Sequence, residues 1–243
     1  MRVTLWVNGN PQTLSNIQSW ANSVYVSGGN VYVAGAQGAG AAERATLWIN
    51  GAPQTLSNIQ SWANSVYVSG GNVYVVGSTG AGAAQRAMLW VNGQPQTLSN
   101  TASTAHVVRV SGGNVYVTGR IGQAGANARA TLWINGVAHS GFDVPSLAHS
   151  VRVSDGTVYT VGSVGTGVNQ RAMLMIDHES QTLSSYQSAA HSVYVSDSDV
   201  YVVGRVLSTT IDGDVAYGAI LWINGEPWVF GTPNSSGITL VVR

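Results

Sequence analysis

The 243-residue sequence predicts an all-β chain that folds as a six-bladed β-propeller, built from four-stranded blades of about 42 residues with an incomplete closing blade. The first observation is a recurring Leu-Trp-x-Asn-Gly segment, whose landmark positions lie 42, 42, 43, 42 and 47 residues apart. These positions are Trp6, Trp48, Trp90, Trp133, Met175 and Trp222. The second is that residues 11–33 recur unchanged as 53–75, and the third is strand-type alternation within each unit. We therefore predict a single propeller domain over residues 1–243.

The second repeat shows why each segment is expected to be a strand or a turn. Residues 46–50 alternate in character and end in Asn50-Gly51, a strong hairpin signal because both turn positions favour positive φ. Residues 53–56 begin with Pro53, which cannot donate a ladder hydrogen bond and so belongs at a sheet edge. Residues 65–69 and 72–77 alternate cleanly around a Gly-Gly turn. A Gly/Ala-rich loop over 78–85 then leads into the next Leu-Trp strand.

We name the four strands of a blade A (Ser-Val-Tyr-Val-Ser), B (Val-Tyr-Val-x-Gly), C (Leu-Trp-x-Asn) and D (Pro-Gln-Thr-Leu), and favour A as the innermost. This order places the polar, proline-bearing strand on the exposed edge. It gives 23 strands, from C and D at the N-terminus to a lone A strand at Thr239–Val242. The closing blade then lacks strand B. Two alternatives remain open: Leu-Trp-x-Asn is innermost, or an earlier segment of a longer chain supplies strand B.

The C-terminal segment from Ser236 to Arg243 is expected to close the ring between the last and first blades. Its removal should destabilise the whole domain, because Ile238, Leu240 and Val242 would leave an apolar core at roughly 1.5–3 kcal/mol each.

Composition excludes several classes of function. Ten arginines balance ten acidic residues and there is no lysine, whereas nucleic-acid binders usually carry a basic excess. No apolar run is long enough for a membrane span, and the first repeat begins at once, so no signal peptide is expected. The absence of cysteine excludes disulfides and thiolate metal sites. We expect a monomer that binds neither nucleic acid nor membrane.

The units Ala-Thr-Leu-Trp-Ile-Asn-Gly and Asn-Ser-Val-Tyr-Val-Ser-Gly-Gly-Asn-Val-Tyr-Val-Ala-Gly resemble a repeat of bacterial propeller proteins of unassigned function. The resemblance covers essentially the whole chain and implies a propeller fold, often in secreted or surface-attached proteins. The blade order is also similar, more loosely, to quinoprotein-like blades, although no quinone-site motif is present. The unbroken identity of the first two copies indicates recent amplification or design.

Candidate ligand-binding residues form three sets on the face where the D-to-A and B-to-C loops emerge. The first is a ring just before strand A: Asn22, Asn64, His106, His149 and His191. The second is the arginine that enters strand C: Arg44, Arg86, Arg129 and Arg171. The third is an aromatic pair expected in the D-to-A loops, Trp20 and Trp62, which could stack on a sugar. For each set, a structural role as a turn cap, an inter-blade hydrogen bond or a cover over a blade is the alternative.

Metal and cofactor sites are not expected. Histidines on different blades should lie too far apart to share one ion at bond lengths near 2.1 Å. The acids gather late in the chain, where Asp155, Asp197 and Asp177 suit turns on the opposite face. Only Glu43, Asp143, Asp212 and Asp214 share the loop face, and no catalytic sequence motif is present.

These features favour a non-catalytic binding or adhesion module that holds a glycan or a protein on the loop face. One alternative is a structural or engineered propeller without a ligand. A second is a propeller glycoside hydrolase or lyase, which requires a cluster of unlike polar residues.

Overall fold

The computed structural model describes residues 1–125, 127–140, 144–177, 179–209 and 215–230, and the regular secondary structure of these residues is almost entirely β-strand. The other elements are three short 3₁₀ turns in the B-to-C loops. They are η1 (Gly40–Ala42), η2 (Gly82–Ala84) and η3 (Gly167–Asn169). None of the helical turns in these ranges is long and apolar enough to span a membrane. The all-β prediction is therefore confirmed.

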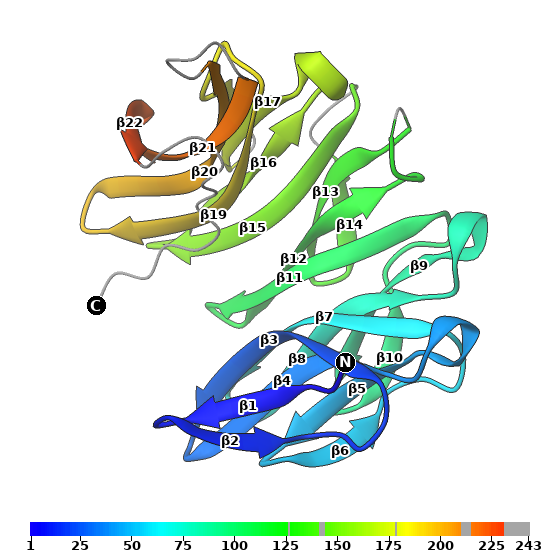
Figure 1. Ribbon diagram of the computed structural model, residues 1–243. Helices are drawn as coiled ribbons and strands as arrows, with labels where there is room; N and C mark the ends of the chain where they lie inside the picture. Colours follow the sequence, from blue (N-terminus) through cyan, green and yellow to red (C-terminus); the bar gives the residue numbers. More distant parts are fainter. Residues whose placement is uncertain (126, 141–143, 178, 210–214, 231–243) are drawn as a thin grey trace. The chain divides into compact units, whose positions relative to one another are not determined.

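The strands follow the four predicted types in regular alternation (Figure 1). The A strands are β3 (Ser19–Ser27), β7 (Ser61–Ser69), β11 (Ser103–Ser111), β15 (Ser146–Ser154) and β19 (Ser188–Ser196). The B strands are β4 (Asn30–Gln37), β8 (Asn72–Thr79), β12 (Asn114–Ile121), β16 (Thr157–Val164) and β20 (Asp199–Thr209). The C strands are β1 (Thr4–Val7), β5 (Arg44–Ile49), β9 (Arg86–Val91), β13 (Arg129–Ile134), β17 (Arg171–Ile176) and β21 (Val215–Ile223). The D strands are β2 (Asn10–Thr13), β6 (Ala52–Thr55), β10 (Gln94–Thr97), β14 (Val137–Ser140), β18 (Glu179–Thr182) and β22 (Glu226–Phe230).

Sheet pairing follows the favoured strand order. Five four-stranded sheets each run A-B-C-D, and β1 pairs with β2 in a two-stranded sheet that supplies the C and D strands of a sixth blade. The alternative that starts each blade at the Leu-Trp strand is wrong, because those strands lie third in the four-stranded sheets. The strand predicted at Thr239–Val242, and with it the predicted closure, lies outside the described residues.

The chain consists of two compact units, which meet in sequence within the third blade. The first unit holds residues 1–117 and 135–137, and the second holds 118–134 and 138–243. Within the first, β3 packs beside β7 and β7 beside β11; within the second, β15 packs beside β19. Strand A therefore lies against strand A of the neighbouring blade in each unit. That residues 1–243 form one domain stays a prediction.

A β-bulge in strand A explains the glycine of the Val-Tyr-Val-x-Gly motif. The register between β19 and β20 shifts between Ala190 and Ser192, and β3, β7 and β15 shift at the equivalent place. The bulge brings the A-strand backbone onto the B-strand glycine. A Cβ on Gly77 would lie 1.9 Å from the carbonyl oxygen of Trp62, and one on Gly204 would lie 2.1 Å from that of Ala189. Only glycine fits there.

The landmark tryptophans form the centre of the blade packing. Trp48, Trp90, Trp133 and Trp222 have no exposed surface, which confirms their predicted role in the core. Trp6 departs from this prediction, since 66% of its surface is exposed. The buried tryptophans pack against the preceding blade, as Trp48 does against Val3 and Leu14, whereas Trp6 belongs to the first sheet of the chain.

Neighbouring blades are joined by the serine that begins each A strand. The Ser61 hydroxyl accepts a hydrogen bond from the Ala45 amide of the preceding C strand at 2.9 Å. Ser188 accepts the Ala172 amide in the same way at 2.8 Å. Each of these bonds is buried and crosses from one blade to the next, so the repeat encodes its own inter-blade connection.

Candidate functional site

The candidate site lies where the A strands begin and the B strands end. In the fifth blade Ser188 pairs with Val206, so the start of β19 and the end of β20 share one end of the sheet, the end from which the B-to-C loop emerges. The sequence placed the first ring just before strand A and Trp20 and Trp62 in loops. Both placements are wrong, because each A strand is nine residues long and includes them. The extra length arises from pairing beyond the bulge.

The two asparagines of the ring bind the backbone of the next blade. The Asn22 side-chain amide donates to the carbonyl oxygen of Ala63 at 2.9 Å, and that of Asn64 donates to Ala105 at 2.8 Å. These contacts correspond to the structural alternative given for this ring. His106 takes the same position in β11 and is half-buried. Ligand binding by these residues stays a prediction.

The last two members of the ring form a histidine pair in the second unit. The imidazole rings of His149 and His191 meet edge to face, with centroids 5.5 Å apart and planes inclined by 74°. Both side chains are half-buried. Burial lowers the pKa of the His191 imidazole below its usual range, and the positive charge of Arg205 lowers it further. His191 is therefore neutral at neutral pH, the state in which an imidazole accepts a proton.

Arg205 adds a positive charge beside this pair. Its guanidinium carbon lies 4.5 Å from the centroid of the Tyr217 ring. Its Nε atom is buried and has no hydrogen-bond partner among the described residues. Arg120, at the equivalent position of the third blade, donates from Nη1 to the carbonyl oxygen of Gly122 in its own loop.

A second arginine, Arg152, lies further along β15 and contacts Tyr194 of β19. The Arg152 guanidinium lies 5.2 Å from the Tyr194 ring centroid, and its Nε is also buried without a described partner. Arg152 and Tyr194 each follow a histidine of the pair by three residues, roughly 10 Å along a strand. The first unit has an equivalent row, in which the ring centroids of Tyr25 and Tyr67 lie 4.8 Å apart with planes inclined by 50°, and Arg109 lies 5.4 Å from the Tyr67 ring centroid.

Sequence reasoning missed Arg205 and Arg152, although a signal was present. Arg205 follows the B-strand glycine, where other blades have Ala36, Ser78 and Ser163. Arg152 stands where three other blades have tyrosine. Both departures are visible when each repeat position is compared across the five full blades. The predicted arginine ring instead occupies a position where these copies agree, whereas the first ring changes from asparagine to histidine after the second blade.

The predicted arginine series is occupied by its own loops. Nη1 of Arg44 donates to the carbonyl oxygens of Ala41 and Glu43 at 2.8 and 2.9 Å. Arg86 and Arg171 repeat this arrangement, and Arg129 donates to Ala128 at 3.0 Å. These bonds hold the B-to-C loop in shape. Recognition of a carboxylate or phosphate by this series stays a prediction.

Trp62 is tied to an acid of the first unit. Its indole nitrogen donates to the Glu43 carboxylate, which also accepts the Gly40 amide at 3.1 Å. Trp62 and Trp20 are both half-buried. The Trp62 contact joins a B-to-C loop to the next A strand, which is a structural role for Glu43. Sugar stacking by Trp20 and Trp62 stays a prediction.

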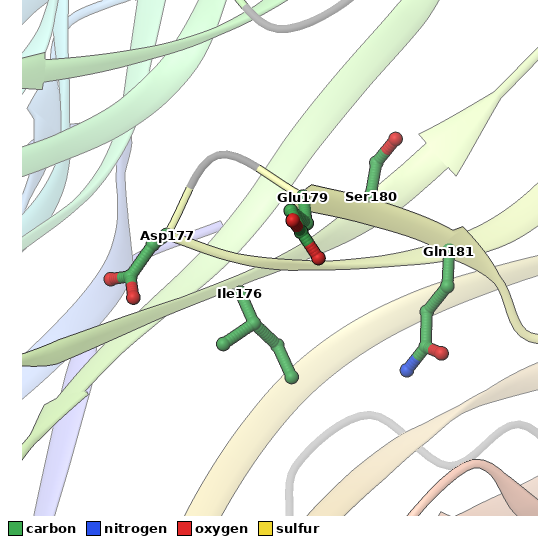
Figure 2. A pocket seen from close by; sticks show the side chains of 5 residues that line it. All are labelled: Ile176, Asp177, Glu179, Ser180 and Gln181. Atoms are coloured by element: carbon green, nitrogen blue, oxygen red, sulfur yellow. The ribbon is translucent and has the colours of Figure 1, made fainter.

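Two acids, Asp177 and Glu179, line a pocket of about 530 Å³ along the β17–β18 hairpin. Figure 2 shows Asp177 and Glu179 at the turn, with Gln181 further along β18. Asp177 has a structural duty, since its Oδ1 accepts the Val158 amide at 2.9 Å and its φ is +53°. It replaces the asparagine of the Asn-Gly turn. Both acids are exposed.

No metal centre is formed by the described residues. Within those ranges no group of three or more histidine, aspartate or glutamate side chains could hold an ion. Asp143, Asp212 and Asp214, which the sequence placed on the loop face, lie outside the described residues.

No protein-family model matches the sequence, and no curated protein matches it. The solved structures similar to it include the β-propeller domain of the trilobed protease from Pyrococcus furiosus, with a TM-score of 0.51 and 11% identity over 93% of this chain and 71% of that one. This likeness confirms the β-propeller fold, and six blades fit the six sheets. Others are an α-L-arabinofuranosidase from Lactobacillus brevis (TM-score 0.49, 13% identity, 89% and 95% coverage) and a GH43_1 enzyme from Xanthomonas citri complexed with xylotriose (0.41, 12%, 88% and 93%).

These comparisons correct the function favoured from the sequence. The similar structures include glycoside hydrolases. They contradict the prediction of a non-catalytic binding or adhesion module without enzymatic activity. The prediction rested on the argument that near-identical repeats could not supply a cluster of unlike polar residues. At these identities the likeness concerns the fold alone. The reaction has to be argued from the residues of this chain.

Proposed function

We propose that this chain is a carbohydrate-active enzyme that breaks a glycosidic bond by acid–base chemistry at the His149–His191 pair. The observation that carries the proposal is the pair itself: two imidazoles 5.5 Å apart, with His191 beside Arg205 and held neutral. A neutral imidazole accepts a proton and its neighbour can return one, the two transfers that bond cleavage requires.

The residues around the His149–His191 pair supply the unlike polar side chains that a glycoside hydrolase or lyase requires. Arg205, Arg152, Tyr217 and Tyr194 are half-buried near the histidines or along the same strands. Tyrosine rings offer flat apolar faces with a polar edge, which suits a sugar ring. The guanidinium groups offer charge-assisted hydrogen bonds to oxygen atoms of a ligand.

Cleavage by two carboxylates has less support. Asp177 and Glu179 share a pocket, but both are exposed and Asp177 anchors its hairpin. A carboxyl that acts as a general acid needs a raised pKa, which burial or a close like charge provides. The histidine pair is therefore the better candidate.

The test is a panel of neutral and acidic polysaccharides, incubated with the purified chain and assayed for new reducing ends. We expect cleavage of at least one polymer and its loss in His191→Gln. The matched control is Asn64→Gln, at the equivalent ring position of the second blade, where the side chain bonds a backbone carbonyl. A panel without any cleavage contradicts the proposal and supports a structural propeller without a ligand.

A further inference from the structure

The position of Arg205 bears on which glycan the proposed enzyme takes. The half-buried guanidinium of Arg205 has no carboxylate partner among the described residues, and an anionic ligand on its accessible side would offset the cost of its partial burial. Arginine binds a carboxylate in a planar, two-pronged geometry that a hydroxyl cannot reproduce. The Arg205 guanidinium carbon lies 4.5 Å from the Tyr217 ring centroid, and Arg205 pairs across the sheet with Ala189, two residues before His191.

The distribution of acids leaves this end of the second unit without negative charge among its described residues. Asp155, Asp197 and Asp199 belong to A-B turns, and Asp177, Glu179 and Glu226 to C-D turns, all at the opposite end of their sheets. No described carboxylate is therefore placed to neutralise Arg205. The other acids of this unit, Asp143, Asp212 and Asp214, lie outside the described residues, and an anionic ligand is a further source of counter-charge.

From this arrangement we infer that the substrate is a uronate-containing glycan, cleaved by β-elimination, with Arg205 binding the carboxylate of the reacting sugar. The inference rests on the proposed function and specifies its substrate class. A carboxylate held by a guanidinium stabilises the negative charge that develops when the neighbouring carbon loses its proton. The base that removes this proton must be neutral and adjacent, and His191 meets both conditions.

The reaction balances without an oxidant or a metal ion as reactant. His191 takes the proton on the ring carbon that bears the carboxylate, and the electron pair of that C–H bond forms a C=C bond to the next ring carbon. The C–O bond from that carbon to the leaving sugar breaks. The leaving oxygen takes a proton from His149 in its protonated form. The products are an unsaturated uronate end and a glycan fragment that ends in a free anomeric hydroxyl.

Arg152 gives the site a second cation along the same strands. It lies three residues beyond His149, roughly 10 Å along β15, and its Nε is likewise buried without a described partner. A polymer with repeated carboxylates could place one on each arginine, whereas a single sugar could reach only one. We therefore expect longer uronate chains to be better substrates than short ones.

The experiment compares each of three uronate polymers (polygalacturonate, polymannuronate and a glucuronan) with its carboxyl-reduced, neutral form. The assay records new reducing ends and, in parallel, the ultraviolet absorbance of the unsaturated product. We expect cleavage with unsaturation of at least one uronate polymer and none of its neutral form. In Arg205→Gln, kcat/KM should fall by roughly 10- to 150-fold, the value of a charge-assisted hydrogen bond. Arg205→Lys should recover only part of the loss, and Arg2→Gln, which removes an exposed arginine, should change nothing.

Each outcome separates this inference from the proposed function. Reducing ends without unsaturation, or equal cleavage of the neutral polymers, overturn the inference and leave the proposed function standing. No cleavage of any uronate polymer overturns the inference, and no cleavage anywhere in the broader panel of polysaccharides overturns the proposed function itself. The comparison of polymers uses the unaltered chain, so it decides the question even if Arg205→Gln fails to fold.

Discussion

The imidazole rings of His149 and His191 lie edge to face, 5.5 Å apart, on the A strands of two adjacent blades. The repeat places them there, since both occupy the bulge of their strand. What distinguishes the two blades chemically is Arg205, which stands beside His191 and has no counterpart in the fourth blade, where Ser163 takes its position. Two equivalent residues thus acquire different environments.

The first prediction concerns pH and stability. Because the folded state lowers the pKa of His191, the unfolded chain binds its proton more readily. The stabilising contribution is complete above the usual histidine value of about 6.5 and is lost as the pH falls through the lower, folded-state value. We expect His191→Asn to lose less stability between about pH 7.5 and about pH 5 than the parent does. Urea unfolding at both pH values measures this, and equal losses in the two proteins would contradict it.

The second prediction concerns the inter-blade serines. Ser188→Ala leaves the buried amide of Ala172 without an acceptor and should destabilise the chain by about 1–3 kcal/mol. Ser180→Ala is the control, because Ser180 is exposed in β18. Its unfolding free energy should change by no more than about 0.5 kcal/mol. Chemical denaturation of both variants decides, and similar effects would show that the bond across the blades contributes little.

The third prediction uses two tryptophans of one hairpin. Trp222 in β21 has no exposed surface, whereas 57% of Trp228 in β22 is exposed. Trp222→Ala should therefore cost about 3–5 kcal/mol through the cavity it leaves. Trp228→Ala should cost about 0.5 kcal/mol or less. If thermal unfolding shows comparable shifts for the two variants, the assignment of strand D to the outer edge of this blade is in error.

The fourth prediction compares two glycines of the second blade. Gly77→Ala places a Cβ 1.9 Å from the carbonyl oxygen of Trp62 and should cost about 3 kcal/mol or more, because only backbone movement relieves the contact. Gly70→Ala meets no atom within 4 Å and is strained only by its φ of +57°, at about 1–2 kcal/mol. Chemical denaturation of the two variants measures the difference. A smaller loss at Gly77 than at Gly70 would mean that the bulge yields easily.

The fold could be predicted from the sequence because the same strand and turn pattern recurs in six copies of the repeat. Alternation, the Asn50-Gly51 turn and Pro53 at the edge were enough to give strand type and order, since each reflects local backbone chemistry. The A strands were predicted too short. Their first half contains Trp62 and Asn64, which show no clear alternation because the bulge interrupts it.

The candidate site was only partly predictable. The histidine pair follows from equivalent positions in neighbouring blades, which a repeat places at the same height. The role of Arg205 depends on its burial, on the ring of Tyr217 and on the acids lying at the opposite end, and none of these is local in sequence. The arginine series looked equally promising as a ring. Its bonds to loop carbonyls, such as that of Arg86 to Ala83, form only in three dimensions.

The measurement that tests the central claim most directly is the effect of His191→Gln on kcat/KM for the glycan that the chain cleaves. If His191 is the general base, the variant should lose roughly 10²- to 10⁴-fold while its melting temperature stays close to that of the parent. Unchanged kcat/KM in a folded His191→Gln protein would contradict the account and remove the histidine pair as the catalytic centre.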